Sequence, residues 1–221
     1  METNVLGLTF NKTSDTALQI LCLGAHSDDI EIGCGGTILK LIQTYPNLNF
    51  YWIVFSAGPR RDIEAYASAE TFLEQTPHKK ILVKDFKDGF FPYTGAEIKT
   101  YFEQLKQEVN PDLIFTHCRH DLHQDHRVIS DLTWNTFRDH LILEYEIPKY
   151  DGDLGAPNLF VHLDEPTCQR KISCLLDHFQ TQTNKHWFTA ETFLSILRLR
   201  GIESKAPHNY AEAFYSRKMV L

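Results

Sequence analysis

The sequence predicts an α/β protein of three layers (α/β/α), in which helices cover both faces of a Rossmann-like, mostly parallel sheet. Short apolar runs alternate along the chain with longer segments in which apolar residues recur at helical spacing. The 221 residues are 43% hydrophobic, which is enough to bury a large core. Because strands that alternate with helices pair in parallel through right-handed crossovers, these observations indicate the fold class.

Four apolar runs have the length of buried strands: LQILCLG (18–24), NFYWIVFSAG (49–58), KKILVKDF (79–86) and DLIFTHC (112–118). The segment after each strand has helical periodicity: GGTILKLIQTY (35–45), RDIEAYASAETFLEQ (61–75), AEIKTYFEQLKQEV (96–109) and residues 124–139. Glycines let the first of these helices approach its strand closely, and Asn-Pro stops the third.

Beyond residue 140 the alternation loosens. Two further strands are expected at LILEYEI (141–147) and NLFVHLD (158–164), and two helices at CQRKISCLLDHFQTQ (168–182) and TAETFLSILRLRG (189–201). No change of composition marks a boundary. We therefore expect one domain over residues 1–221, with a core at 15–140 and a C-terminal extension at 141–221.

The charge balance argues against a nucleic-acid partner. The net charge is −7, and no basic run is longer than two residues, whereas nucleic-acid binding depends on clustered Lys and Arg. The five cysteines are an odd number without a CxxC pair, which disfavours a disulfide framework. The first 15 residues lack the pattern of a signal peptide, and no apolar run is long enough for a membrane span. These features predict a cytoplasmic protein, and homo-oligomerisation stays open.

Two clusters of ionisable residues follow strands of the predicted sheet. The stretch HSDD (26–29) comes directly after the first strand, and DLHQDH (121–126) comes shortly after the fourth. In open parallel sheets, ligands bind beyond the carboxyl ends of the strands. If these two strands are close in the sheet, both clusters face one crevice.

A divalent cation explains why so many ionisable groups stand where buried strands end. Burying unpaired charge costs several kcal/mol per ion, roughly, unless something compensates it. We assign His26, Asp29 and His126 as metal ligands, which leaves one position for a water molecule, as in catalytic zinc sites. Neighbouring residues on an extended chain point to opposite sides, so Asp28 is free to act as general base on that water.

The second cluster supplies the other expected catalytic groups. His123 and His126 are three residues apart and share a face if a helix begins there. We therefore expect His123 to donate a hydrogen bond to the developing oxyanion, with Asp125 orienting His123 and favouring its protonated form. Two simpler interpretations stay open. In the first, Asp28 and Asp29 only form a loop or a helix N-cap. In the second, the two histidines are surface residues at the start of an acidic helix.

HSDD followed by GCGGTI, with DLHQDH later, resembles the LmbE-like or PIG-L family of zinc-dependent N-deacetylases. The resemblance implies the same roles for His26, Asp28, Asp29, His123 and His126. Ser27 replaces the usual proline of the first motif, and Cys118 stands where the second motif usually has its first His, with His117 one residue out of register.

The resemblance extends to two candidate substrate-binding residues. It implies an arginine that reaches the pocket, which Arg61 matches best, and YAEAF (210–214) is similar to the family's closing segment. Tyr210 in that segment is a candidate for substrate binding, with packing as the alternative. GCGG (33–36) lacks the spacing of a dinucleotide fingerprint, so we expect no nucleotide cofactor.

The predicted function is a zinc-dependent hydrolase that removes an N-acetyl group from an amino sugar, N-acetylglucosaminyl or related, and releases acetate. One Zn²⁺ per chain is expected, although sites of His and carboxylate also accept other divalent ions. Two alternatives remain: another metallohydrolase, such as a phosphoesterase with two metals, and a metal-binding protein without catalysis. The natural substrate has no signature in the sequence.

Overall fold

The computed structural model describes residues 7, 9–10 and 16–220, and within them seven strands form one sheet in the order β3-β2-β1-β4-β5-β7-β6. The strands are β1 (Leu18–His26), β2 (Leu48–Ser56), β3 (His78–Val83), β4 (Leu113–His117), β5 (Leu141–Tyr145), β6 (Leu159–Leu163) and β7 (Tyr210–Ser216). Strands β1 to β5 pair in parallel, and β7 runs antiparallel to both β5 and β6. The C-terminal third thus extends the same sheet.

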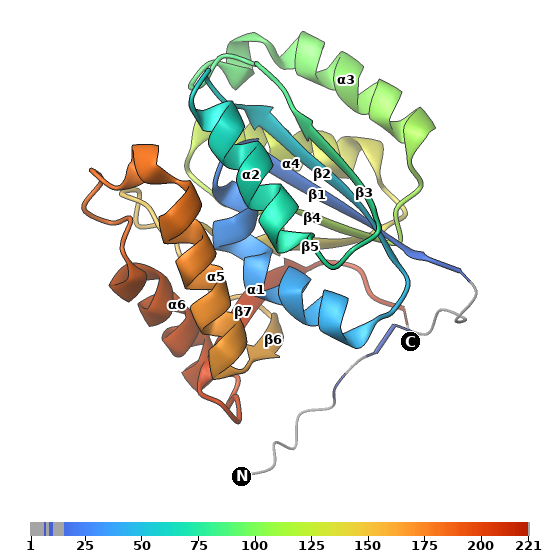
Figure 1. Ribbon diagram of the computed structural model, residues 1–221. Helices are drawn as coiled ribbons and strands as arrows, with labels where there is room; N and C mark the ends of the chain where they lie inside the picture. Colours follow the sequence, from blue (N-terminus) through green and yellow to red (C-terminus); the bar gives the residue numbers. More distant parts are fainter. Residues whose placement is uncertain (1–6, 8, 11–15, 221) are drawn as a thin grey trace.

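Helices cover both faces of the sheet and make three layers, as predicted (Figure 1). They are α1 (Asp29–Thr44), α2 (Arg61–Phe72), α3 (Gly95–Glu108), α4 (Gln124–Thr136), α5 (Glu165–His178) and α6 (Ala190–Glu203), with short 3-10 turns η1 (Phe91–Tyr93) and η2 (Gln180–Gln182). The apolar residues of α1, α2, α5 and α6 pack on one face, and those of α3 and α4 on the other.

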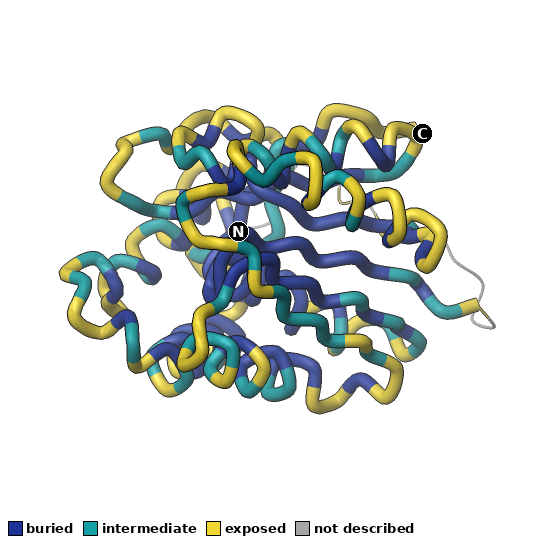
Figure 2. Tube along the Cα trace, turned by 90° about the horizontal axis from the view of Figure 1, so that it is seen from above, coloured by how far each residue is buried: buried dark blue, intermediate teal, exposed yellow. Residues whose placement is uncertain are grey.

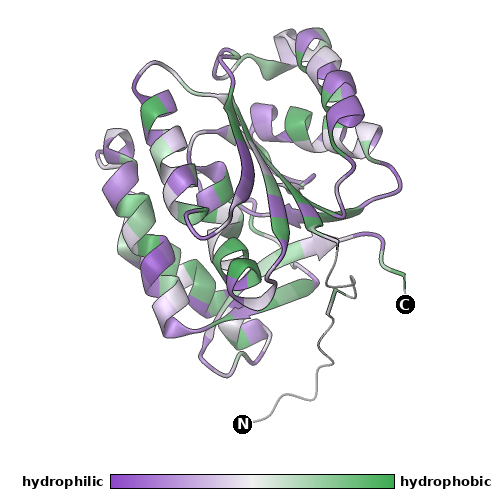
Figure 3. Ribbon diagram, turned by 45° about the vertical axis from the view of Figure 1, so that its right-hand side comes forward, coloured by the Kyte–Doolittle hydropathy of each residue, from purple (hydrophilic) through white to green (hydrophobic). Residues whose placement is uncertain are grey.

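Strand β1 lies at the centre of this arrangement. Ile20 and Cys22 belong to one buried cluster, whereas Leu21 and Leu23 belong to the cluster on the opposite face. A strand covered on both sides is apolar throughout, which explains the unbroken run in the sequence. Buried residues accordingly fill the sheet and exposed ones the outer sides of the helices (Figure 2). Figure 3 shows that the central strands are largely hydrophobic, whereas hydrophilic residues are frequent on the helices and loops.

Helix α1 begins six residues earlier than the sequence predicts, at Asp29 instead of residue 35. The GCGG stretch therefore lies inside the helix, despite the low helix propensity of glycine. A Cβ atom at Gly33 would overlap the ring of Tyr145 on β5, so glycine is needed there for close packing. The early start of α1 places Asp29 in its first turn, close to the end of β1.

Strand β7 was not among the strands predicted from the sequence.

A buried ion pair fixes the middle of α1 to the C-terminal part of the chain. Lys171 on α5 donates to the carbonyl oxygen of Ile32 and to Glu212 on β7, at 2.6 Å each. The Glu212 carboxylate accepts from the backbone N–H groups of Gly36 and Thr37, at 2.8 and 2.6 Å. Both charged side chains are almost fully buried, so each depends on the other for compensation.

Replacing Lys171 by methionine should therefore destabilise the fold strongly, because the Glu212 charge is left buried without its partner. We expect a loss of about 3–5 kcal/mol in the free energy of unfolding, measured by urea titration. Lys80→Met is the matched control, since the Lys80–Glu108 pair is exposed and should contribute about 1 kcal/mol or less. Adding Glu212→Gln to Lys171→Met should recover part of the loss; an unchanged midpoint in Lys171→Met would contradict the assignment.

No helix in the described residues combines the length and the apolar character that crossing a bilayer requires. The N-terminal stretch on which the signal-peptide argument rests lies largely outside the described residues.

Candidate active site

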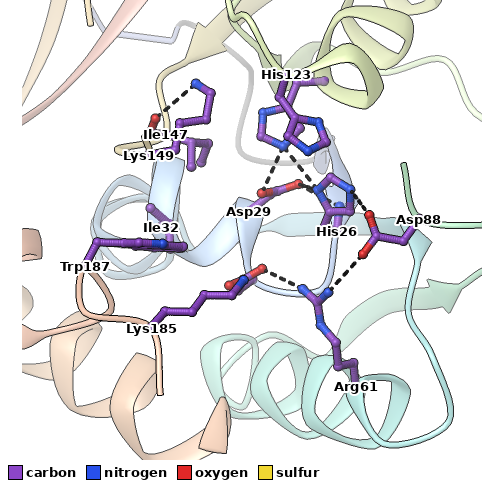
Figure 4. Close-up of a pocket in the computed structure, with 12 residues that line it drawn as sticks. His26, Asp29, Ile32, Arg61, Asp88, His123, Ile147, Lys149, Lys185 and Trp187 are labelled. Carbon is purple, nitrogen blue, oxygen red and sulfur yellow. Dashed lines mark hydrogen bonds and ion pairs between the residues drawn. The ribbon is translucent and has the colours of Figure 1, made fainter. Parts of the chain in front are cut away.

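The segments that follow β1, β3 and β4 meet in one pocket, together with parts of the C-terminal third (Figure 4). The pocket holds about 510 Å³ of space, a figure that includes open solvent. It is lined by His26, Asp28, Asp29, Ile32, Arg61, Asp88, His123, His126, Ile147, Lys149, Lys185 and Trp187. Five of the six expected catalytic and metal-binding residues are among them, and the sixth, Asp125, contacts His26 directly.

The side chains of three expected ligand residues converge at the end of β1. The Nδ1 atom of His26 lies 3.2 Å from Nε2 of His126 and 3.4 Å from Oδ2 of Asp29. The Oδ1 atom of Asp29 lies 3.5 Å from Nε2 of His126. Zinc ligands at about 2.0–2.1 Å in a tetrahedron are separated by about 3.3 Å. Each contact is close to this spacing, but the two imidazoles face different oxygens of Asp29. With one ligand atom per residue, the groups within 4.8 Å at this point are His26, His123 and His126, and Asp29, His117 and His126.

The outer nitrogens of both imidazoles are held by carboxylates. Nδ1 of His126 lies 2.9 Å from Asp121, and Nε2 of His26 lies 3.2 Å from Asp125 and from Asp88. Such partners keep the proton on the outer nitrogen and leave the inner lone pair for a metal. Two inner lone pairs 3.2 Å apart, beside a carboxylate, need a positive charge between them. The donor set thus fits a divalent ion.

Local charges adjust the protonation of these groups. Burial and the neighbouring His117 lower the pKa of His126 to about 4, so its imidazole is neutral and able to bind metal. Burial opposes protonation of His26, but hydrogen bonds to Asp125 and Asp29 outweigh it and raise the pKa of His26 well above its ordinary value. In the absence of a metal, a proton on His26 thus partly balances the surrounding carboxylates.

Asp28 is the N-cap residue of α1, but its side chain makes no capping hydrogen bond. The carboxylate instead lines the pocket, with Oδ1 3.2 Å from the Arg61 guanidinium. Burial raises the pKa of Asp28, although Arg61 opposes this rise. A carboxylate with a raised pKa that faces the pocket is suited to accept a proton from water. The alternative of a helix N-cap agrees with the backbone position of Asp28, but it does not explain why its side chain makes no capping hydrogen bond and lines the pocket.

Arg61 reaches the pocket from the first turn of α2, where the resemblance places it. Its Nε donates to the hydroxyl of Ser27 at 2.9 Å, and its two terminal nitrogens lie 3.2 Å from Asp28 and 3.5 Å from Asp88. Ser27 therefore supplies a hydrogen-bond acceptor that proline at this position would lack. Its effect goes beyond loop stiffness, because it helps to hold the Arg61 side chain.

The expected role of Asp125 needs correction. Its carboxylate accepts from the backbone N–H groups of Gly89 and Phe91, at 2.7 and 3.1 Å, and contacts His26 instead of the ring of His123. Its own N–H donates to Nδ1 of His123 at 3.3 Å, because His123 is the N-cap of α4. Burial lowers the pKa of His123, so the expected protonated form is not favoured. The neutral ring carries its proton on Nε2.

Two polar residues near the ligand atoms had no role in the sequence-based prediction: Asp88, which it did not name, and His117, which it noted only as one residue out of register with the second motif. Asp88 follows β3 and contacts His26 and Arg61, while 59% of its side chain is exposed. The hydrogen bond from His26 lowers the pKa of Asp88 to about 2. His117, the last residue of β4, is fully buried, with its Nε2 3.2 Å from Asp29 and its ring stacked on His126. His117 is the last residue of β4, the kind of position that identified the other members, whereas Asp88 lies five residues beyond the end of β3.

The C-terminal third contributes pocket residues that the sequence did not indicate. Ile147 and Lys149 follow β5, and Lys185 and Trp187 lie between η2 and α6. Tyr210, by contrast, packs with the cluster formed by Leu163, Cys168 and Leu197 and is not among the pocket-lining residues. The structure therefore gives Tyr210 the packing role that was its alternative.

The fold and the pocket define an α/β enzyme with a cluster of the kind that hydrolases use. A family model described as "PIG-L: GlcNAc-PI de-N-acetylase" matches residues 21–137. The chain therefore belongs to the PIG-L family of hydrolytic N-deacetylases. The matched region contains every proposed ligand and catalytic residue, but it ends before the residues that β5 and the C-terminal helices bring to the pocket.

Solved structures with the same fold cover most of the chain. The conserved protein TT1542 from Thermus thermophilus is 20% identical, with a TM-score of 0.70, over 92% of this chain and 96% of that chain. N,N'-diacetylchitobiose deacetylase from Pyrococcus horikoshii is 22% identical, with a TM-score of 0.68, over 91% and 84%. A comparison with curated proteins finds no match.

The same fold also carries a different chemistry. The 4-carboxy-2-hydroxymuconate hydratase GalB from Pseudomonas putida KT2440 is 15% identical, with a TM-score of 0.68, over 92% of this chain and 98% of that chain. Likeness of fold alone therefore does not select an activity, which has to be argued from the site.

Proposed function

We propose that this protein is a zinc-dependent N-deacetylase that hydrolyses the acetamide of an amino sugar, N-acetylglucosaminyl or related, and releases acetate. The observation that carries the proposal is the convergence of one carboxylate and two imidazole nitrogens beside a second carboxylate, Asp28, which faces the pocket and pairs with Arg61. The site would lie at the carboxyl ends of the parallel strands, where a Rossmann-like sheet binds its ligands. The five cysteines are free and buried, which fits the proposed cytoplasmic location.

His26, Asp29 and His126 would hold the cation. When bound, such a cation supplies a Lewis acid that polarises the amide carbonyl and makes water more acidic. Asp28 accepts a proton from the attacking water as its oxygen bonds to the carbonyl carbon. The Nε2–H of His123 donates a hydrogen bond to the oxyanion that develops. The proton held by Asp28 then passes to the nitrogen, the C–N bond breaks, and a free amine and acetate leave.

Asp125 takes part as a positioning residue. Its carboxylate fixes the ring of His26, and its backbone N–H fixes the tautomer of His123. It therefore connects the proposed metal site with the proposed oxyanion donor. The carboxylate is itself anchored by two backbone N–H groups of the loop after β3.

The direct test is incubation of the zinc-loaded protein with a panel of N-acetylated amino sugars, with acetate as the readout. Release of acetate together with a free amine is the expected result. Zinc binding without acetate from any member of the panel would favour the non-catalytic alternative. A metal content of two per chain, with hydrolysis of phosphate esters, would favour the phosphoesterase; we expect one per chain.

A further inference from the structure

Three imidazoles surround the Asp29 carboxylate, and the proposed metal site uses only two of them. Nδ1 of His26 and Nε2 of His117 lie 3.4 and 3.2 Å from Oδ2 of Asp29. Nε2 of His126 lies 3.5 Å from the other oxygen, Oδ1. The third imidazole, His117, has no part in the proposed reaction. Its side chain is fully buried and is not among those that line the pocket.

The position of His117 in β4 explains why its ring turns toward Asp29. Alternate residues of a strand share a face, and Phe115, two positions earlier, packs in the cluster to which α1 contributes. His117 therefore points to the face that α1 covers, and Asp29 lies in the first turn of that helix. The family resemblance gives His117 no role, because it is one residue out of register with the second motif.

The contacts of His117 place two hydrogen-bond acceptors next to each other. The backbone N–H of Ala25 donates to Nε2 of His117 at 2.9 Å, so this nitrogen holds a lone pair and the ring proton is on Nδ1. Oδ2 of Asp29, also an acceptor, lies 3.2 Å from the same nitrogen. The Tyr145 hydroxyl does not separate them, since it donates to the carbonyl oxygen of Leu23 at 2.6 Å. A positive charge in contact with both atoms would remove this repulsion.

Asp29, His117 and His126 together have the composition of a ligand set for a divalent cation. Each can offer one ligand atom, these atoms all lie within 4.8 Å of one another, and all three residues are buried. The proposed catalytic set of His26, Asp29 and His126 likewise consists of one carboxylate and two imidazoles. The two sets differ only in which imidazole joins Asp29 and His126, so a single cation is held by one set or the other.

We propose that His117 is an auxiliary metal ligand, which forms with Asp29 and His126 a second position for the cation. We call it the buried position, and the set that includes His26 the catalytic position. The inference rests on the proposed function only in that a divalent cation belongs to this site. His26 lines the pocket beside Asp29 (Figure 4) and His117 does not, so the buried position retains the cation without presenting it to substrate.

The partners of the two imidazoles decide which position is preferred. Asp125 and Asp88 contact the outer nitrogen of His26, whereas Nδ1 of His117 has no hydrogen-bond partner among the described residues. Loss of such a partner weakens metal affinity by about 10–100-fold. Ligation by His117 also costs its nitrogen the hydrogen bond from Ala25. We therefore expect the cation to occupy the catalytic position in the wild type and the buried position when His26 is removed.

The experiment measures zinc affinity, by competition with a chromogenic chelator, in the wild type, His26→Ala, His117→Gln and the variant with both substitutions. His26→Ala should lose about 10–100-fold in affinity, because the weaker buried position takes over. His117→Gln keeps an acceptor for the Ala25 N–H but lacks the imidazole, and alone it should bind zinc like the wild type. In the His26→Ala background the same substitution should cost at least about a further tenfold. Such non-additivity shows that the two imidazoles replace each other.

His123 is the competing replacement, because His26, His123 and His126 also offer ligand atoms within 4.8 Å of one another. The matched control is therefore His26→Ala combined with His123→Ala, whose zinc affinity should equal that of His26→Ala. X-ray absorption at the zinc edge counts the bound imidazoles directly. It should show two in the wild type and in His26→Ala, and one when His117→Gln is added. The spectrum of His26→Ala needs a single substitution, so it decides the matter even if a double variant fails to fold.

The outcomes separate the buried position from the proposed function. Loss of zinc from His26→Ala as severe as that expected for His126→Ala, with one imidazole bound, overturns the buried position and leaves the catalytic ligand set intact. Zinc retained by His26→Ala but lost when His123→Ala is added also overturns it. Failure of the wild type to bind zinc overturns both proposals. Acetate release tests the deacetylase function independently, since no binding measurement depends on turnover.

Discussion

Replacement of Asp28 by asparagine should remove most of the deacetylase activity and leave metal binding intact. Asparagine has the shape of aspartate and keeps an oxygen for the Arg61 guanidinium, which lies 3.2 Å from Asp28. Its amide does not accept a proton from water. Because general-base catalysis contributes about 10²–10⁴-fold, we expect kcat to fall by that factor, measured as acetate release from the best sugar of the panel.

The interpretation depends on the metal content of the variant. Asp28 is not among the proposed ligands, so zinc measured by elemental analysis should stay at the wild-type level. Asp177→Asn, an exposed position on α5, is the matched control and should keep full activity. Turnover by Asp28→Asn within a few-fold of the wild type would show that another group takes the proton.

The sequence was sufficient to predict the parallel core of the sheet and the meeting of its two ionisable clusters. Both follow from rules that act over short distances. An unbroken apolar run such as LQILCLG indicates a strand covered on both faces, and adjacent parallel strands end at the same edge. Strands β1 and β4 are neighbours in the sheet, so HSDD and DLHQDH face one pocket.

The remaining features depend on contacts that no local pattern encodes. Helix α1 extends through glycines because packing against Tyr145 outweighs their low helix propensity. The partner of the Asp125 carboxylate is decided by the backbone of the loop after β3, which brings two N–H groups to it. Lys185 lies in a polar segment without periodicity, and only the tertiary fold places it at the pocket.

Replacement of His126 by alanine should abolish tight metal binding. Only His26 and Asp29 of the proposed ligands would remain, and the imidazole that Asp121 orients at 2.9 Å would be lost. Since the loss of an outer hydrogen-bond partner alone weakens metal affinity by about 10–100-fold, the loss of a ligand should cost more than about a hundredfold. Zinc retained after dialysis, measured by elemental analysis, and competition with a chromogenic chelator give the two readouts.

A graded series distinguishes loss of a ligand from loss of structure. Asp121→Asn keeps the ligand and removes the charge of the carboxylate that orients it, so its zinc affinity should lie between those of the wild type and His126→Ala. His208→Ala removes an exposed histidine from the α6–β7 connection and should bind zinc like the wild type. Circular dichroism should show all three variants folded. A folded His126→Ala protein that retains one zinc after dialysis would mean that the cation is held by other residues, such as Asp29 and His117, and the proposed ligand set would have to be replaced.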